Sequence, residues 1–167
     1  MTTVLLRGGS VVDDDGVRLA DVLVEDDRIA RIAPGIPVPP GTTVVDCGER
    51  LVLPGFVDAH SHAGALVFEP EVQLALLRQG VTTIVTGQDG VGPAPGDGVY
   101  AWTYFSAIDG EHPHHDGGGI GDLLATYDGA TPLNVATLVP AGTLRHLVRG
   151  DGPGAAAPDE LLSLIHI

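Results

Sequence analysis

Two histidines separated by one residue, His60 and His62, close the stretch Pro-Gly-Phe-Val-Asp-Ala-His-Ser-His that begins at Pro54. Successive side chains of a strand point to opposite faces, so on a strand these imidazoles share a face and can converge on one metal ion. Asp58 falls on that face too and could orient a ligand through a hydrogen bond. The alternative is a pair of structural histidines, which is the more frequent meaning of an isolated His-x-His.

The elements around this pair follow a strand, helix, strand order, which is typical of parallel α/β folds. We expect a buried strand over Leu51 to His62 and a second strand, covered on both faces, over Val81 to Thr86. The other expected elements are helices or helical segments over Pro70 to Gln79, Trp102 to Ile108, Ile120 to Tyr127 and Thr143 to Val148, and a strand over Leu133 to Val139. The loop Gly87 to Gly98 follows the second strand at its carboxyl end, where α/β barrels hold their active-site loops.

Residues 1–53 show a different pattern, with short β-rich runs separated by turn residues. Alternating valines in Ala20 to Ala33, with Asp26-Asp27 as the turn, predict a hairpin that the proline cluster Pro34 to Pro40 ends. We expect a small antiparallel sheet, whose remaining strands are Val4 to Arg7, Ser10 to Val12 and Thr43 to Asp46. A domain boundary near residue 53 follows from the change of pattern.

Composition restricts the partners and the chemistry. Acidic residues outnumber basic ones 22 to 8, and the net charge of −14 disfavours nucleic acid and anionic membranes as partners. All 8 basic residues are arginines, so Schiff-base chemistry and a carboxylated-lysine metal bridge are excluded within these residues. Cys47 is the single cysteine, which excludes an intramolecular disulfide and favours a cytoplasmic location. The pattern contains neither a signal peptide nor an apolar stretch that could span a membrane.

The β-rich start, the hairpin end Arg-Ile-Ala-Arg-Ile at Arg28 to Ile32, and the Pro54 to His62 motif together resemble the amidohydrolase superfamily. Further segments narrow the resemblance to its N-acyl-D-amino-acid deacylase (D-aminoacylase) branch, namely Gly80 to Gly87, Ala94-Pro95, Asn134 to Ala136, Leu138-Val139 and Gly142 to Arg145. The resemblance covers about Val4 to Arg149. It implies an α/β metal-dependent-hydrolase TIM (β/α)8 barrel preceded by a small β-sandwich lobe.

The chain departs from that branch at a residue that the resemblance assigns to the metal. Where the branch commonly has Asn-Cys-Gly after its second strand, with the cysteine a zinc ligand, this chain has Gln88-Asp89-Gly90. A carboxylate oxygen can still bind zinc or a harder metal, so the expected ligands are His60, His62 and Asp89 around a divalent ion, with zinc preferred. The alternative for Asp89 is a loop aspartate that turns the chain. Pro140-Ala141 also replaces a frequent Gly-His, and no chemistry is carried over there.

Two other tracts invite a functional interpretation. His112 to Asp116 contains three imidazoles and a carboxylate, but glycines follow directly, so we expect a flexible, solvated loop rather than a metal site. Trp102, Tyr104 and Phe105 could line a pocket, although aromatic residues in a helical segment more often serve packing.

Length bears on how much of the barrel is present. A (β/α)8 barrel needs about 250 residues, whereas 114 residues follow residue 53, enough for about the first three strands. The expected organisation is a lobe over 1–53, a partial barrel over 54–161, and a segment 162–167 that corresponds to the translated end of a sequencing-library adapter, so His166 is not considered a ligand. The resemblance places further histidine ligands and a catalytic general acid/base aspartate on later strands, outside these residues.

For the intact protein, the expected reaction is metal-dependent hydrolysis of the amide in an N-acyl-D-amino acid, a small-molecule substrate. The enzyme alternatives are hydantoinase, dihydroorotase or isoaspartyl dipeptidase activity. A non-catalytic metal-binding fragment is the alternative of a different class. By themselves, these 167 residues are expected to be inactive and to aggregate or stay partly molten, because a three-strand barrel segment exposes apolar surface.

Overall fold

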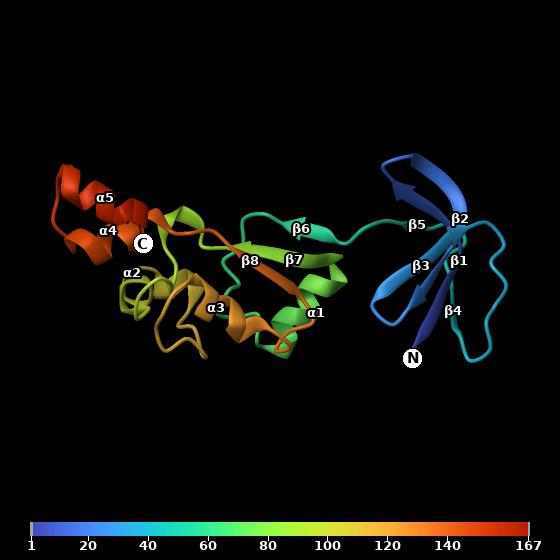
Figure 1. The fold of residues 1–167 in the computed structure, drawn as a ribbon. Helices are drawn as coiled ribbons and strands as arrows, with labels where there is room; N and C mark the ends of the chain where they lie inside the picture. Colours follow the sequence, from blue (N-terminus) through green and yellow to red (C-terminus); the bar gives the residue numbers. More distant parts are fainter. Residues whose placement is uncertain (1, 167) are drawn as a thin grey trace. The chain divides into compact units, whose positions relative to one another are not determined.

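The computed structural model describes residues 2–166, without the side chains of residues 165 and 166. The expectations for Ile167 and for the His166 side chain therefore lie outside the described residues. The chain divides into two compact units, Met1–Pro54 and Gly55–Ile167, which are described separately (Figure 1). Among the helices of the described part, none is both long and apolar enough to cross a membrane.

The first unit is a five-stranded sheet in which β1 (Thr3–Asp13) is central. Its other strands are β2 (Gly16–Glu25), β3 (Arg28–Ala33), β4 (Thr43–Asp46) and β5 (Leu51–Val52). The sheet order is β3-β2-β1-β4, and β5 also pairs with β1. The two stretches expected as separate strands before residue 13 form one strand, whose pairing register shifts between Leu6 and Gly9.

The expectation of an antiparallel sheet is correct for part of this unit and wrong for the rest. The pairs β1 with β2 and β2 with β3 are antiparallel, as the hairpin pattern predicts. In contrast, β4 and β5 run parallel to β1. The proline-rich segment 34–40 is the physical reason, because it ends the hairpin and connects β3 to β4 across the sheet. Strand β4 therefore pairs with the edge of β1 that β2 leaves free, and it runs in the same direction as β1.

The second unit holds a three-stranded sheet with the order β6-β7-β8 (Figure 1). The strands are β6 (Phe56–Asp58), β7 (Val81–Thr86) and β8 (Asn134–Thr137), and both pairings are parallel. Between and after them lie α1 (Pro70–Arg78), the 3₁₀ turn η1 (Gln88–Gly90), α2 (Val99–Asp109), α3 (Ile120–Tyr127), α4 (Ala141–Arg149) and α5 (Pro158–His166). The predicted strand, helix, strand order is confirmed, with Pro70 at the first position of its helix.

The strand expected over Leu51 to His62 is not one strand. Its first residues form β5 in the first sheet, and only Phe56–Asp58 join the second sheet. Pro54 cannot donate a ladder hydrogen bond, and Gly55 lies so close to Thr82 that any side chain there would collide with it. The expectation of burial is also wrong, because Phe56 is 55% and Val57 60% exposed.

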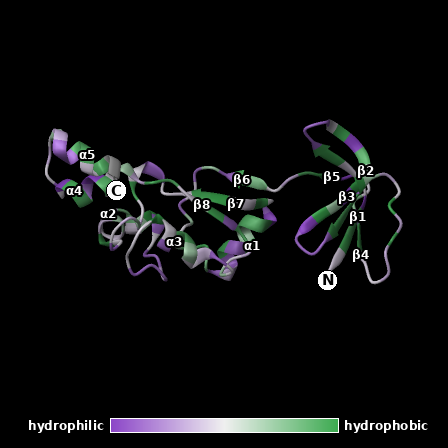
Figure 2. Ribbon diagram, in the orientation of Figure 1, coloured by the Kyte–Doolittle hydropathy of each residue, from purple (hydrophilic) through white to green (hydrophobic). Residues whose placement is uncertain are grey.

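Helices α1 and α3 contact the parallel sheet at β7 and β8, respectively. The apolar cluster between them contains Val67, Ile84, Leu123, Tyr127 and Leu133, each at most 6% exposed. Figure 2 shows hydrophobic residues along β7 and β8, from which Ile84 is buried in this core and Val81 and Val135 pack against it. Packing at the centre of the sheet therefore holds the carboxyl ends of the strands, and the loops that follow them, in place.

Candidate metal centre

His60, His62 and Asp89 come together at the carboxyl ends of two neighbouring parallel strands. The histidines follow β6 and the aspartate lies in the turn after β7. The Nε2 atom of His62 is 3.3 Å and that of His60 is 3.8 Å from Oδ2 of Asp89. One potential ligand atom from each residue lies within 4.8 Å of the other two. This is the group of residues that the sequence predicted, but it is assembled by a different local structure.

The strand alternation used to place the histidines does not apply to them. Strand β6 ends at Asp58, so His60 lies in the bend that follows and His62 in the irregular chain after it. The main chain between them is anchored instead by Ser61, whose N–H donates to the carbonyl of Val85 on β7 over 3.0 Å. The two rings meet Asp89 because this anchor holds their backbone next to the end of β7.

Asp89 is positioned by an unusual backbone and by a buried glutamine. Its φ is 56°, and Gly87 before it has a φ of 74°, so the chain turns sharply after β7 through left-handed conformations. The Gln88 side chain is buried between the strands and donates to the carbonyls of Ala59 (2.9 Å) and Val85 (3.0 Å). Gln88 thereby ties the histidine segment to the segment that carries Asp89.

A second carboxylate determines which ring nitrogen of His62 faces Asp89. Nδ1 of His62 is 2.7 Å from Oδ1 of Asp109, the last residue of α2, so in the neutral ring Nδ1 carries the hydrogen and donates a hydrogen bond to Asp109. The Nε2 lone pair then points toward the Asp89 oxygen, and two acceptors 3.3 Å apart repel each other unless a cation or a proton lies between them. The arrangement is that of carboxylate–histidine–metal sites.

The spacing of these atoms can be compared with that required by a metal. Ligand atoms about 2.0–2.2 Å from a tetrahedral zinc ion lie about 3.3 Å apart. The pair formed by His62 and Asp89 already has this spacing, and His60, at 3.8 Å, must move inward slightly. The His60 side chain is 60% exposed and free to do so, whereas that of His62 is 27% exposed. Two imidazoles and a carboxylate therefore fit a divalent ion.

The sequence missed Asp109 and assigned its task to Asp58. The carboxylate of Asp58 accepts a hydrogen bond from the main-chain N–H of His60 (3.2 Å), so it fixes the backbone after the strand rather than an imidazole. Burial raises the pKa of Asp109, while its hydrogen bond with His62 opposes that rise. A signal was present, because an acidic residue in the last turn of a helix is unfavourable to the helix dipole and calls for another role.

The histidine tract at 112–116 is partly buried, contrary to the expectation of a solvated loop. His112 Nε2 lies 3.0 Å from the hydroxyl of Tyr127, which itself donates to the carbonyl of Gly64, so His112 must be the donor. Its Nδ1 accepts from the N–H of His114 (3.3 Å), which makes the ring neutral, and burial lowers its pKa to about 4. Packing on Phe68 and Tyr127, which the neighbouring glycines do not indicate, accounts for the burial of His112.

The expectation that the aromatic residues of α2 pack in the core is wrong. Trp102 is 48% and Tyr104 68% exposed. Trp102 lines a cavity that also reaches His62, whereas Phe105 packs against the His62 ring with centroids 5.5 Å apart. Helix α2 therefore places two of its aromatic residues, Trp102 and Phe105, next to the candidate metal centre.

The fold and the site together define a class: parallel α/β proteins with a histidine and carboxylate cluster at the carboxyl ends of the strands. The model of the Amidohydrolase family matches residues 43–164. The chain therefore belongs to the Amidohydrolase family, as the resemblance predicted.

Among curated proteins, the chain is 32% identical to a D-aminoacylase of Alcaligenes xylosoxydans xylosoxydans over 169 residues, covering 96% of this chain and 33% of that protein. It is 41% identical to dihydropyrimidinase 2 of Caenorhabditis elegans over 85 residues, covering 51% of this chain and 16% of that protein. The chain thus spans about a third or less of the length of these relatives.

Solved structures of deacylases are also similar to this chain. A crystal structure of a D-aminoacylase superposes with a TM-score of 0.78 at 30% identity, covering 96% of this chain and 34% of that one. An N-acyl-D-glutamate deacylase from Bordetella bronchiseptica, complexed with zinc and a phosphonate inhibitor, gives a TM-score of 0.72 at 29% identity over the same shares. The α/β fold is therefore shared with the D-aminoacylase structures.

Proposed function

We propose that His60, His62 and Asp89 bind a divalent metal ion, with zinc preferred, in a hydrolase of the amide bond of N-acyl-D-amino acids. The facing acceptors of His62 and Asp89, 3.3 Å apart with Asp109 behind the ring, carry the proposal. We infer further that β6, β7 and β8 are the first three strands of a (β/α)8 barrel, and that residues 1–53 belong to a β-sandwich lobe. The similarity to D-aminoacylases supports both inferences.

In this proposal each residue has a separate task. His62 presents Nε2 as a neutral donor atom because Asp109 retains the proton on Nδ1. Asp89 supplies negative charge that offsets the charge of the ion, and its oxygen replaces the cysteine ligand that the branch commonly uses. A bound divalent metal would polarise the substrate carbonyl and lower the pKa of a water molecule. The general acid/base role is assigned to an aspartate of the whole protein outside the residues described.

The isolated 167-residue chain is proposed to bind metal but not to hydrolyse substrate, because it spans about a third of its deacylase relatives. We place the protein in the cytoplasm, with a small N-acyl amino acid as its partner and neither nucleic acid nor membrane as a ligand. The net charge of −14 supports the exclusion of polyanions.

The test uses the whole protein to which this chain belongs, loaded with zinc, and a panel of N-acetyl-D-amino acids with their L enantiomers. Hydrolysis of the D forms, lost in His62→Ala and retained in the exposed-histidine control His114→Ala, is the expected result. Absence of D-specific deacylation in metal-loaded, folded protein overturns the proposal.

A dihydropyrimidinase-type activity is the second candidate, favoured by the higher identity over the shorter match. Hydantoin, dihydropyrimidines, dihydroorotate and isoaspartyl dipeptides are therefore included in the same panel. Ring opening of a cyclic amide without deacylation would assign this second function. Metal binding by the whole protein with no turnover of any substrate would identify a non-catalytic metal-binding protein.

A further inference from the structure

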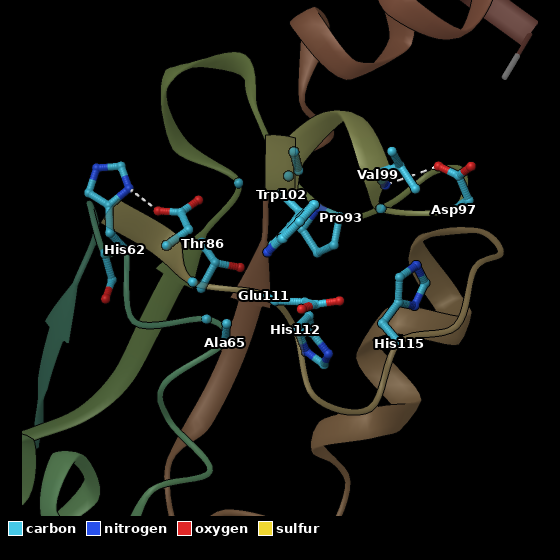
Figure 3. Close-up of a pocket in the computed structure, with 18 of the residues that line it drawn as sticks. His62, Ala65, Thr86, Pro93, Asp97, Val99, Trp102, Glu111, His112 and His115 are labelled. Carbon is cyan, nitrogen blue, oxygen red and sulfur yellow. Dashed lines mark hydrogen bonds and ion pairs between the residues drawn. The ribbon is translucent and has the colours of Figure 1, made fainter. Parts of the chain in front are cut away.

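A cavity of about 100 Å³ adjoins the candidate metal centre. It is bounded by the segment after β6, the end of β7, helix α2 and the loop 110–115 (Figure 3). This space is several times that needed for one water molecule, which is about 10–15 Å³. His62 and Asp109 are part of its wall, so a group bound at the metal centre lies next to the cavity.

The charged groups of this wall are all acidic. Asp97, Asp109 and Glu111 line the cavity, and no lysine or arginine of the described residues does. Asp109 is engaged by His62, which leaves the charges of Asp97 and Glu111. One oxygen of Asp97 accepts from the N–H of Val99 over 3.0 Å, so its second oxygen is available to a ligand. Within residues 2–166, Glu111 makes no hydrogen bond or ion pair.

Two further side chains give this space the features of a cation site. Trp102 lines the cavity and is 48% exposed, and an indole face attracts cations more strongly than other aromatic rings. His115 is only 9% exposed, and its buried Nε2 has no hydrogen-bond partner among the described residues. In Figure 3, the ring of Trp102, the carboxylate of Glu111 and the ring of His115 surround the same space.

The neighbouring histidine contributes no positive charge. His112 is neutral, because Nδ1 accepts a hydrogen bond and Nε2 donates one to Tyr127. A metal ion held by two neutral imidazoles and Asp89, with Asp109 behind them, leaves this group of charges close to zero. The balance in the cavity is therefore set by Asp97 and Glu111, and an anionic group would face two carboxylates there.

We propose that this cavity binds a cationic group of the substrate, a guanidinium or an ammonium, between Trp102 and the carboxylates of Glu111 and Asp97. This inference rests on the proposed function and names its substrate class: N-acyl-D-amino acids in which either the side chain or the acyl group is positively charged. Carboxylate-bearing side chains, as in the N-acyl-D-glutamate that names one relative's substrate, are excluded by repulsion.

A binding measurement tests the cation site without turnover. Trp102 is the single tryptophan of these 167 residues, so in the whole protein the part of the fluorescence change that Trp102→Phe abolishes reports on the cavity. We expect N-acetyl-D-arginine to bind about tenfold tighter than its neutral isostere N-acetyl-D-citrulline, which corresponds to about 1.4 kcal/mol. N-acetyl-D-glutamate should bind more weakly than both. Equal affinities for the arginine and citrulline derivatives, together with equal affinities for a derivative with a cationic acyl group and its neutral counterpart, overturn the inference, as does tighter binding of the glutamate derivative.

Variants assign the effect to the cavity. Glu111→Gln should reduce the preference for arginine at least about threefold, and Asp97→Asn, which keeps the oxygen that caps Val99, should act in the same direction. Glu71→Gln is the matched control, since Glu71 lies in the first turn of α1 and does not line the cavity. Loss of preference in the control, or its retention in both cavity variants, would contradict the assignment.

Turnover by the whole protein then distinguishes the two sources of the cation and separates this inference from the proposed function. A higher kcat/KM for N-acetyl-D-arginine than for N-acetyl-D-citrulline places the side chain in the cavity, and a preference for a cationic over a neutral acyl group places the acyl group there. Deacylation with neither preference leaves the proposed function intact and refutes the cation site. Cation-selective binding without deacylation of any D substrate supports the site and refutes the function.

Discussion

Two groups of histidines in the second unit differ in what faces their ring nitrogens. His60 and His62 have carboxylates around them, with Asp89 between the two Nε2 atoms and Asp109 on Nδ1 of His62. The group of His112, His114 and His115 has more imidazoles, but the nitrogens of His112 meet a tyrosine hydroxyl and a main-chain N–H, and the rings of His112 and His114 contact Phe68.

This difference shows that the density of histidines does not make a metal site. Among residues 2–166, only His60, His62 and Asp89 place ligand atoms within reach of one ion. In the other group, His112 has both ring nitrogens in hydrogen bonds and is kept neutral by burial. A metal site needs lone pairs that converge without protons between them, and a carboxylate behind a ring provides this condition.

Among the changes that test the difference between the two histidine groups, loss of a metal ligand should have the largest effect on zinc affinity. His62→Ala should lower the zinc affinity of the chain at least about 100-fold, because it removes both a donor atom and the group that Asp109 orients. Isothermal titration with zinc measures it. His114→Ala, in the other group, should leave the affinity unchanged; a comparable loss there would show that the second group binds the metal.

Removing the charge behind the ring should have the next largest effect. Asp109→Asn keeps the size of the side chain and can still accept a hydrogen bond, but it no longer offsets the positive charge of an ion bound by His62. Zinc affinity should fall about 10–100-fold. Thermal unfolding of the metal-free variant is the control, and an unchanged zinc affinity with normal folding would remove Asp109 from the centre.

Changing the ligand chemistry should alter selectivity more than strength. Asp89→Cys restores the thiolate that the branch commonly has, and soft ligands favour zinc and cadmium over manganese. The ratio of cadmium to manganese affinity should rise at least about tenfold in competition titrations. Asp89→Glu, which keeps the carboxylate, is the matched control, and a rise in that variant would contradict the role given to sulfur.

The second group should affect stability with pH rather than metal binding. The pKa of His112 falls from its ordinary value of 6.5 to about 4 on folding, so between these values the unfolded chain binds more protons. The free energy of unfolding should therefore decrease as the pH falls from 6.5 toward 4. Urea unfolding of His112→Gln should show a smaller decrease than the original chain, and an identical pH profile would exclude His112 as the cause.

The sequence predicted the elements of the second unit better than their connection to the histidines. The span of α3 (Ile120–Tyr127) matches its prediction, because an apolar period and flanking glycines are local signals. The strand before the histidines ends four residues early. It also begins late, after Gly55, which packs against Thr82 in a contact between segments far apart in sequence. The parallel placement of β4 and β5 likewise depends on pairing that no local pattern specifies.

The three candidate ligands were predicted from residue types and from a resemblance, and the structure brings them together. Asp109, which orients His62, was not predicted from the sequence. It is 47 positions from His62, and no spacing rule connects a helix end to a strand end. The cavity that adjoins them was also beyond reach of sequence analysis. Its wall comes from separate segments, and the burial of His112 depends on packing against Phe68 and Tyr127.

The double hydrogen bond of the Gln88 amide has a kinetic consequence for this centre. Since this side chain holds the carbonyls of Ala59 and Val85 together, the donor atoms are gathered by the protein before an ion arrives. Capture of the ion then needs no folding step, so the association rate should be limited by shedding of water from the ion. The spacing between His62 and Asp89 is then the one that an ion must match, whereas the exposed His60 adjusts its position to the ion.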